Sequence, residues 1–121
     1  MPHCELEYSD NVLDKPDNHT ILKAIHNALV ETKLFSLNDI KSRVIVHHNY
    51  LIGDGKQSRA FVALKISILS GKDKASKKKI SEGCIEILKS FFPKSIKKLK
   101  LSITVQILDM DKGTYGRVKN Y

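Results

Sequence analysis

Residues 59–69 have the sequence RAFVALKISIL, and this stretch decides the fold class. Alternate side chains, beginning with Ala60, are all apolar, which is the period of a β-strand with one face against a core. The opposite side also carries the apolar residues Phe61, Ala63 and Leu69. Because apolar residues on both faces are typical of a central strand, we expect residues 59–69 to lie inside a sheet that is covered on both sides.

A helix and a further strand are predicted on the C-terminal side of this stretch. After Ser70 and Gly71, apolar residues at helical spacing predict an amphipathic helix that ends before Pro93, on the evidence of Ile80, Cys84, Ile87, Leu88 and Phe91. Residues 99–107 then alternate apolar and polar side chains, which predicts a strand with one polar face. A polar tail, residues 109–121, follows this strand.

The N-terminal side has the same order of elements. Gly53-Asp54-Gly55 predicts a loop, and residues 42–50 before it are rich in β-branched residues, as strands are. Residues 21–29 have apolar positions at helical spacing, with Asp17 or Asn18 as the N-cap. Residues 2–8 alternate again, so a first strand begins at Pro2.

The element order is therefore βαβ followed by βαβ. We expect one domain, residues 1–121, with halves at about 2–52 and 58–108 and a C-terminal tail at 109–121. The fold class is α/β (α+β), a single four-stranded sheet with two helices. Because connections between parallel strands are right-handed, both helices should cover the same face. The other face then needs a different cover, which we expect from other subunits of a homo-oligomer.

Composition limits the kinds of partner. The 121 residues include 21 Lys and Arg against 13 Asp and Glu, a formal net charge of +8, which favours nucleic acid, acidic lipid or small polycarboxylates. The two cysteines, Cys4 and Cys84, have no spacing suited to a disulfide framework or a zinc site. No apolar run has the length of a signal peptide or a membrane span, so we expect a cytoplasmic protein.

Pro2 is the first candidate for chemistry. Removal of Met1 would leave a secondary amine at the start of a strand, and an α-amino group has a reference pKa of roughly 8. Burial and nearby cations lower that pKa, so such an amine can act as a base near neutral pH. The alternative is a Met-Pro start with no chemical role, and a retained Met1 would make the Pro2 nitrogen a non-basic amide.

Several blocks of sequence carry a family resemblance that spans nearly the whole chain. They are Met1-Pro2-His3, Glu7, Ser9-Asp10-Asn11, Ser42-Arg43-Val44, Asp54-Gly55 and Ala60-Phe61-Val62. In order and spacing these blocks resemble the 5-carboxymethyl-2-hydroxymuconate isomerase family of the tautomerase superfamily. The resemblance implies the double βαβ fold that this family shares with 4-oxalocrotonate tautomerase.

The resemblance also implies an activity. It implies a homotrimeric isomerase of aromatic-compound catabolism, in which Pro2 moves a proton within an unsaturated 2-hydroxy or 2-oxo acid such as 5-carboxymethyl-2-hydroxymuconate, without metal or organic cofactor. Lys41, Arg43 and Lys72 would then bind the carboxylates of this small-molecule substrate. The family pattern has arginine where Lys41 and Lys72 stand, and lysine cannot form the bidentate fork of arginine with a carboxylate. The alternative for each is an exposed surface cation.

A basic RNA-binding module of ferredoxin-like topology is the alternative function. The basic run, Lys72 to Lys79 and Lys94 to Lys100, and the βαββαβ order both suit it. Base stacking needs several aromatic residues on the central strands, but residues 58–64 contain only Phe61, and the chain has no Trp and 7% aromatic residues. We therefore interpret most of the basic run as a solvated helix face and loop, and expect neither nucleic acid nor membrane as a partner.

Three other features leave more than one interpretation open. His47 and His48 are adjacent on a predicted strand and so point to opposite faces, which is poor geometry for a joint metal site. His3, next to Pro2, either lines the same cleft or faces solvent. Tyr115 and Arg117 in the tail either cap the pocket, reach a neighbouring subunit or belong to a frayed end.

Overall fold

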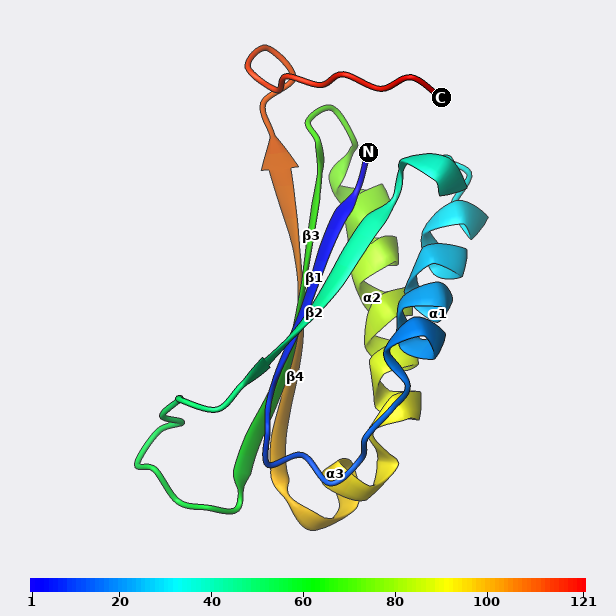
Figure 1. The fold of residues 1–121 in the computed structure, drawn as a ribbon. Coiled ribbons are helices and arrows are strands. Elements are labelled where there is room, and N and C mark those ends of the chain that lie inside the picture. Colours follow the sequence, from blue (N-terminus) through cyan, green and yellow to red (C-terminus); the bar gives the residue numbers. More distant parts are fainter.

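The computed structural model describes residues 1–121 and contains one four-stranded sheet in the order β2-β1-β3-β4. The strands are β1 (His3–Ser9), β2 (Lys41–His47), β3 (Arg59–Leu69) and β4 (Lys100–Met110). The pairs β1–β2 and β3–β4 are parallel, and β1 and β3 join the two pairs antiparallel in the middle of the sheet. The predicted pair of βαβ units is therefore confirmed, and Figure 1 shows them side by side.

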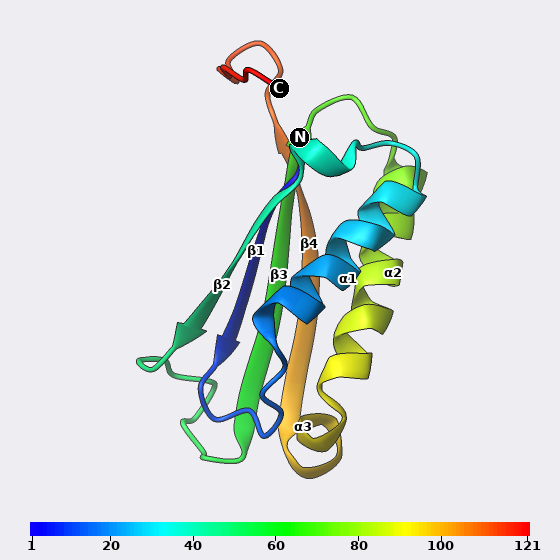
Figure 2. The same ribbon diagram turned by 45° about the vertical axis from the view of Figure 1, so that its right-hand side comes forward.

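Two long helices, α1 (Asn18–Glu31) and α2 (Lys74–Phe91), cover the same face of the sheet, as predicted (Figures 1 and 2). Each begins at an aspartate that caps it: Asp17 accepts a hydrogen bond from the Thr20 backbone N–H at 3.0 Å, and Asp73 accepts one from the Ser76 N–H at 2.8 Å. No helix has the length and hydropathy needed to cross a lipid bilayer.

A short helix, α3 (Pro93–Lys98), was not predicted from the sequence. Pro93 ends α2, as the sequence predicts, but proline also suits the first position of a helix, where its missing N–H is not needed. The carboxylate of Asp14 accepts hydrogen bonds from the backbone N–H groups of Lys94 and Ser95, at 3.1 and 2.9 Å. These bonds satisfy donors that the start of the helix leaves without an internal partner.

The hydrophobic core lies between the helices and the sheet. Alternate residues of β3 from Ala60 to Ile68 are buried in it, which confirms the predicted inward face. Both cysteines also belong to this core as free thiols. The fully buried Phe92, just after α2, packs edge-on against Tyr8 of β1 with ring centroids 5.7 Å apart, so the α2–α3 junction is fixed to the sheet.

Two strand ends differ from the prediction. β2 ends at His47, before Tyr50, because the residues after it turn away to Asp10: His48 Nδ1 lies 2.7 Å from one carboxylate oxygen, and the Tyr50 hydroxyl donates to the other at 3.2 Å. β4 continues to Met110, beyond the predicted end, because it pairs with the whole of β3.

The sheet order excludes the ferredoxin-like alternative. In that topology another strand splits each βαβ unit, so its two strands are not neighbours. Here β1 lies directly beside β2, and β3 lies directly beside β4. The ferredoxin-like prediction is therefore wrong for this chain, since βαββαβ order along a sequence is compatible with more than one strand arrangement.

The face of the sheet that no helix covers has a mixed character. Phe61, Ala63 and Leu69 lie on it and are partly buried. Beside them, Arg43 pairs with Glu5 at 3.3 Å, and Glu7 pairs with His47 at 2.8 Å and Lys65 at 4.0 Å. A partner that covers this face would have to accommodate a row of charges as well as apolar side chains.

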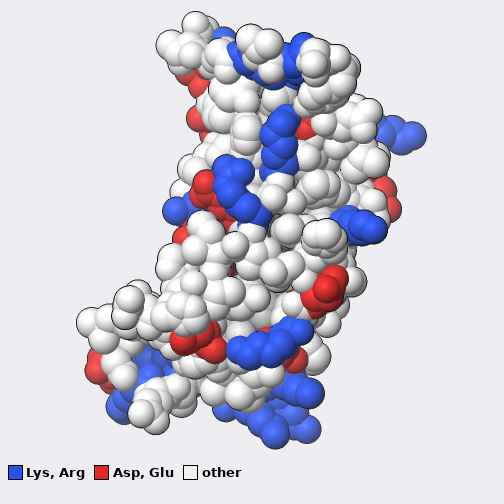
Figure 3. Space-filling view, viewed as in Figure 1, with Lys and Arg blue, Asp and Glu red and all other residues white.

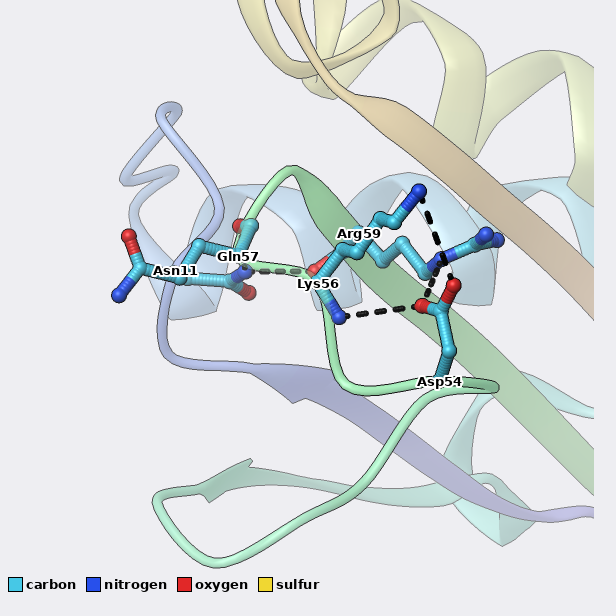
Figure 4. Close-up of polar contacts among 5 residues, drawn as sticks. All are labelled: Asn11, Asp54, Lys56, Gln57 and Arg59. Carbon is cyan, nitrogen blue, oxygen red and sulfur yellow. Dashed lines mark hydrogen bonds and ion pairs between the residues drawn. The ribbon is translucent and has the colours of Figure 1, made fainter.

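The sheet has two ends with different contents. We call the end where β1 and β2 begin and β3 and β4 finish the Pro2 end, and the opposite end, with the 48–58 loop and α3, the far end. At the far end Asn11 donates to the Arg59 carbonyl at 2.6 Å, and the Arg59 side chain pairs with Asp54 at 3.1 Å (Figure 4). Gly53 and Gly55 have φ of 56° and 85°, the left-handed conformation that glycine adopts without strain.

Candidate functional site

Pro2 is buried and immediately precedes β1. Its carbonyl oxygen accepts a hydrogen bond from the Lys41 backbone N–H at 3.1 Å, which holds the start of β2 against it. The register continues from this bond, with His3 opposite Lys41 and Glu5 opposite Arg43. The same parallel pairing that builds the sheet thus brings a cationic strand start to the amino terminus.

Positive charge gathers around the amino terminus. Burial lowers the pKa of the Met1 amino group; Asp39 opposes this by raising it, while Arg117, Lys41 and Lys72 lower it further. Figure 3 shows Lys and Arg side chains at the end of the molecule where the two termini lie. An amine in such surroundings is more often neutral, and therefore basic, at neutral pH than one in water.

The structure brings two of the three predicted cations to this place. The Lys41 ammonium donates to the Asp39 carbonyl at 3.3 Å and to the Tyr121 hydroxyl at 3.2 Å, without a carboxylate partner. Lys72 is partly buried in the β3–α2 loop, directly after Gly71, whose φ of 117° turns the chain back toward the helix. Both side chains can therefore offer their charge to an anion beside Pro2.

Arg43, the third predicted cation, lies two residues farther along β2 on the uncovered face of the sheet. Its guanidinium pairs with Glu5 at 3.3 Å, and its side chain is 48% exposed. It remains close enough to His3 to act on it: burial lowers the pKa of His3, and the charges of Arg43 and Lys41 lower it further. Within a single chain, Arg43 therefore lies near the Pro2 region, but its guanidinium is already paired with the carboxylate of Glu5.

The C-terminal tail also reaches this region, and most of its contribution was missed in the sequence. The His3 Nε2 atom lies 2.7 Å from the Tyr115 hydroxyl, and Arg117 contacts the sulfur of Met1. Asp39, which the sequence did not single out, pairs with Lys119 at 2.9 Å. In the structure the tail caps the Pro2 region of its own chain, which is one of the three interpretations that the sequence left open. His3 lines this region, where it meets Tyr115.

Other potentially reactive groups are unsuited to chemistry. Burial raises the pKa of Cys4 to about 12 and that of Cys84 to about 11, so neither thiol ionises near neutral pH. His47 and His48 bond to different carboxylates, Glu7 and Asp10. The surface hollows lie elsewhere, for example between α1 and α2, and none is lined by Pro2.

The arrangement as a whole suits proton transfer to and from an anionic molecule. A partly buried terminal amine next to several cations is less protonated than usual, and the same cations can bind carboxylates and stabilise enolate charge as it develops. The model of one protein family, 5-carboxymethyl-2-hydroxymuconate isomerase, matches residues 2–120. The chain belongs to this family. It is an isomerase of the tautomerase superfamily.

Individual family members agree over almost the whole length. The chain is 26% identical over 110 residues to the 5-carboxymethyl-2-hydroxymuconate Delta-isomerase of Escherichia coli, covering 91% of this chain and 87% of the relative. The crystal structure of a 5-carboxymethyl-2-hydroxymuconate isomerase from Deinococcus radiodurans R1 superposes with a TM-score of 0.90 at 25% identity, over 98% of this chain and 90% of that one.

A more distant structure shares the fold. A fused 4-OT protein, described as a symmetric trimer, superposes with a TM-score of 0.76 at 15% identity, over 98% of this chain and 94% of that chain. The tautomerase-like fold expected from the sequence resemblance is therefore confirmed, with α3 as an addition to the predicted elements.

Proposed function

We propose that this isomerase is a keto–enol tautomerase that moves a proton within an unsaturated 2-hydroxy or 2-oxo carboxylic acid such as 5-carboxymethyl-2-hydroxymuconate. After removal of Met1, the secondary amine of Pro2 is the group that carries the proton. The observation behind this proposal is the position of Pro2, which is buried at the head of β1 with Lys41, Lys72 and Arg117 close to the amino terminus.

The proposed reaction needs one base that returns the proton it takes. The neutral amine accepts a proton from the dienol form of the substrate, and electrons shift along the conjugated system. The proton comes from the hydroxyl oxygen of the dienol, and the resulting ammonium delivers it to a carbon of the conjugated system, so that an O–H bond breaks, a C–H bond forms and the conjugated ketone results. Atoms and electrons balance without an oxidant or a cofactor, so the proposal includes neither a metal nor an organic cofactor.

Cations near Pro2 have two roles in this proposal. Lys41 and Lys72 bind substrate carboxylates and stabilise the negative charge on the enolate oxygen. Their charge also keeps the pKa of the amine low, so that it is neutral before substrate binds. Arg43, which is about half exposed, can exchange its partner Glu5 for a substrate carboxylate.

We further propose that the chain assembles as a homotrimer. The proposal is supported by the sheet face that no helix covers and by the similarity in fold to the fused 4-OT protein described as a trimer. Assembly would cover the mixed face and place walls around Pro2 that a single chain does not supply. The mass in solution, measured by sedimentation equilibrium, should be three times 13.7 kDa.

The decisive experiment joins mass spectrometry with kinetics. The intact mass should show loss of Met1, and the purified protein should convert 2-hydroxymuconate to its ketone. Pro2→Ala should lower kcat/KM at least about 10²-fold, because it replaces the positioned secondary amine that acts as the base. Pro16→Ala, at a partly buried position in the loop before α1, is the matched control and should retain activity. Full activity of Pro2→Ala, or of protein that keeps Met1, would contradict the proposal.

A further inference from the structure

Residues 111–121, which we call the strap, contact the region around the amino terminus at every second residue from Tyr115 to Tyr121. Tyr115 bonds to His3 at 2.7 Å, Arg117 contacts Met1, and Lys119 pairs with Asp39 at 2.9 Å. The Tyr121 hydroxyl, two residues farther on, accepts a hydrogen bond from Lys41 at 3.2 Å. In an extended chain alternate side chains point to the same side, so one face of the strap is directed at the amino terminus.

The other side of the strap faces solvent. Val118, between two of the contacting residues, is 99% exposed. Figures 1 and 2 show the strap crossing above the amino terminus at the end of the sheet. The contacts are side-chain bonds to β1, to β2 and to the turn before β2, so the strap is positioned by the same elements that position Pro2.

Arg117 is placed to act on whatever lies next to the amino terminus. Its Nη1 donates to the sulfur of Met1, the residue whose removal the proposed function requires. The thioether is a weak acceptor, so this contact holds the guanidinium only weakly. Once Met1 is gone, the guanidinium can donate to a stronger acceptor beside the Pro2 nitrogen.

Arg117 also differs from the cations already assigned to the site. Lys41 and Lys72 are point charges, whereas a guanidinium can hold a carboxylate through two parallel hydrogen bonds. The other two arginines, Arg43 and Arg59, are engaged in ion pairs with Glu5 and Asp54. Arg117 takes part in no ion pair, so it is the guanidinium that the structure leaves available at the Pro2 end.

We propose that the strap closes over substrate in the Pro2 site and that Arg117 binds a substrate carboxylate there. This inference rests on the proposed function. It supplies from the C-terminal strap the bidentate partner that Lys41 and Lys72 cannot provide. Lys119 acts as a positioning residue, because its bond to Asp39 fixes the strap without touching the substrate.

The test compares Arg117→Ala with Lys97→Ala, which removes the same charge from an exposed site in α3 at the far end. Arg117→Ala should raise KM for 2-hydroxymuconate about 10- to 100-fold, the effect of losing a charged hydrogen bond, and Lys97→Ala should leave it unchanged. The inhibition constant of a saturated dicarboxylate such as glutarate should rise by a similar factor. Arg117→Lys should recover part of the loss.

A pH profile gives a second readout. The charge of Arg117 lowers the pKa of the Met1 amino group, and we expect it to act in the same direction on the Pro2 amine exposed by removal of Met1. Arg117→Ala should therefore move the rising limb of kcat/KM to higher pH. Unchanged KM, inhibition and pH profile in Arg117→Ala would overturn the strap proposal. Pro2→Ala, measured in the same assay, separates the two proposals: if it is inactive while Arg117→Ala behaves as wild type, only the strap proposal fails.

Discussion

The two ends of the sheet use charged residues in opposite ways. At the far end the basic residues in and beside the 48–58 loop have carboxylate partners: Arg59, which follows the loop, and Lys56 pair with Asp54 at 3.1 and 3.9 Å, and His48 Nδ1 lies 2.7 Å from an Asp10 oxygen. At the Pro2 end Asp39, the carboxylate that acts on the terminal amine, is paired with Lys119. Lys41, Lys72 and Arg117, the cations that act on the terminal amine, form no ion pair.

This difference separates a structural role from a binding role. Paired charges hold the glycine-containing 48–58 loop in one conformation and are not free to bind a ligand, while the unpaired lysines at the same end, Lys94, Lys97 and Lys98, lie exposed on α3, away from the amino terminus. A surplus of positive charge next to a buried amine is costly unless an anion joins it, because like charges repel. Substitutions of the cations at the Pro2 end should therefore lower activity with little effect on stability. Substitutions in the hydrogen-bonded network at the far end should lower stability with little effect on activity.

The largest effect is expected from the paired variant Lys41→Ala/Lys72→Ala. Loss of two charged contacts to substrate should lower kcat/KM at least about 100-fold, on the basis of about 10-fold or more for each. Unfolding by urea should change little, because neither side chain is buried in the core. Steady-state kinetics on 2-hydroxymuconate is the measurement.

Its matched control is Lys97→Ala/Lys98→Ala, which removes the same charge from exposed positions in α3. If this control loses as much activity as the double variant at the Pro2 end, then overall charge attracts the substrate and the comparison of the two ends is broken.

A smaller and opposite effect is expected from Asn11→Leu at the far end. The variant removes the hydrogen bond from Asn11 to the Arg59 carbonyl at 2.6 Å, which leaves that carbonyl without its partner. It should lower the free energy of unfolding by about 1–3 kcal/mol. Activity per folded molecule should remain that of the wild type. A variant of normal stability with impaired turnover would show that the far end takes part in the chemistry.

The fold was largely predictable because the periodicities are local. Each strand alternates and each long helix repeats at helical spacing, so the chain order βαββαβ follows from the side chains alone. The order of the strands in the sheet depends on contacts between residues far apart in the sequence, which periodicity does not reveal. The direct pairing of β1 with β2 distinguishes this fold from a ferredoxin-like one. The helix at Pro93 was missed because one residue both ends α2 and begins α3.

The site was predictable only in part. Pro2 and Lys41 lie at the starts of strands, which the alternation of apolar and polar side chains locates, and the family resemblance implies a role for both. Arg117 and Asp39 lie in a tail and a turn with no periodicity, and their approach to Pro2 depends on contacts across about the whole length of the chain. The alternating polar and aromatic residues from Tyr115 to Tyr121 are a signal that could have indicated an extended segment with one contacting face.

The smallest effect is expected in the pH dependence of Asp39→Asn. A base works only while neutral, so activity is present above the pKa of the amine and lost as the pH falls through it. Asp39 raises the pKa of the Met1 amino group, and we expect the same effect on the Pro2 amine once Met1 is removed, so removing its charge should shift the rising limb of kcat/KM to lower pH. Asp54→Asn, the same change at the far end, should not move the limb. A shift to higher pH in Asp39→Asn would contradict the assigned electrostatics.

The contact between the strap and the amino terminus has a practical side. Both chain ends lie together at one end of the sheet (Figure 2), so an affinity peptide or fluorescent dye fused to either of them would stand where substrate has to enter. Surface immobilisation through the exposed lysines of α3, Lys94, Lys97 and Lys98, would instead leave that entrance facing the solution.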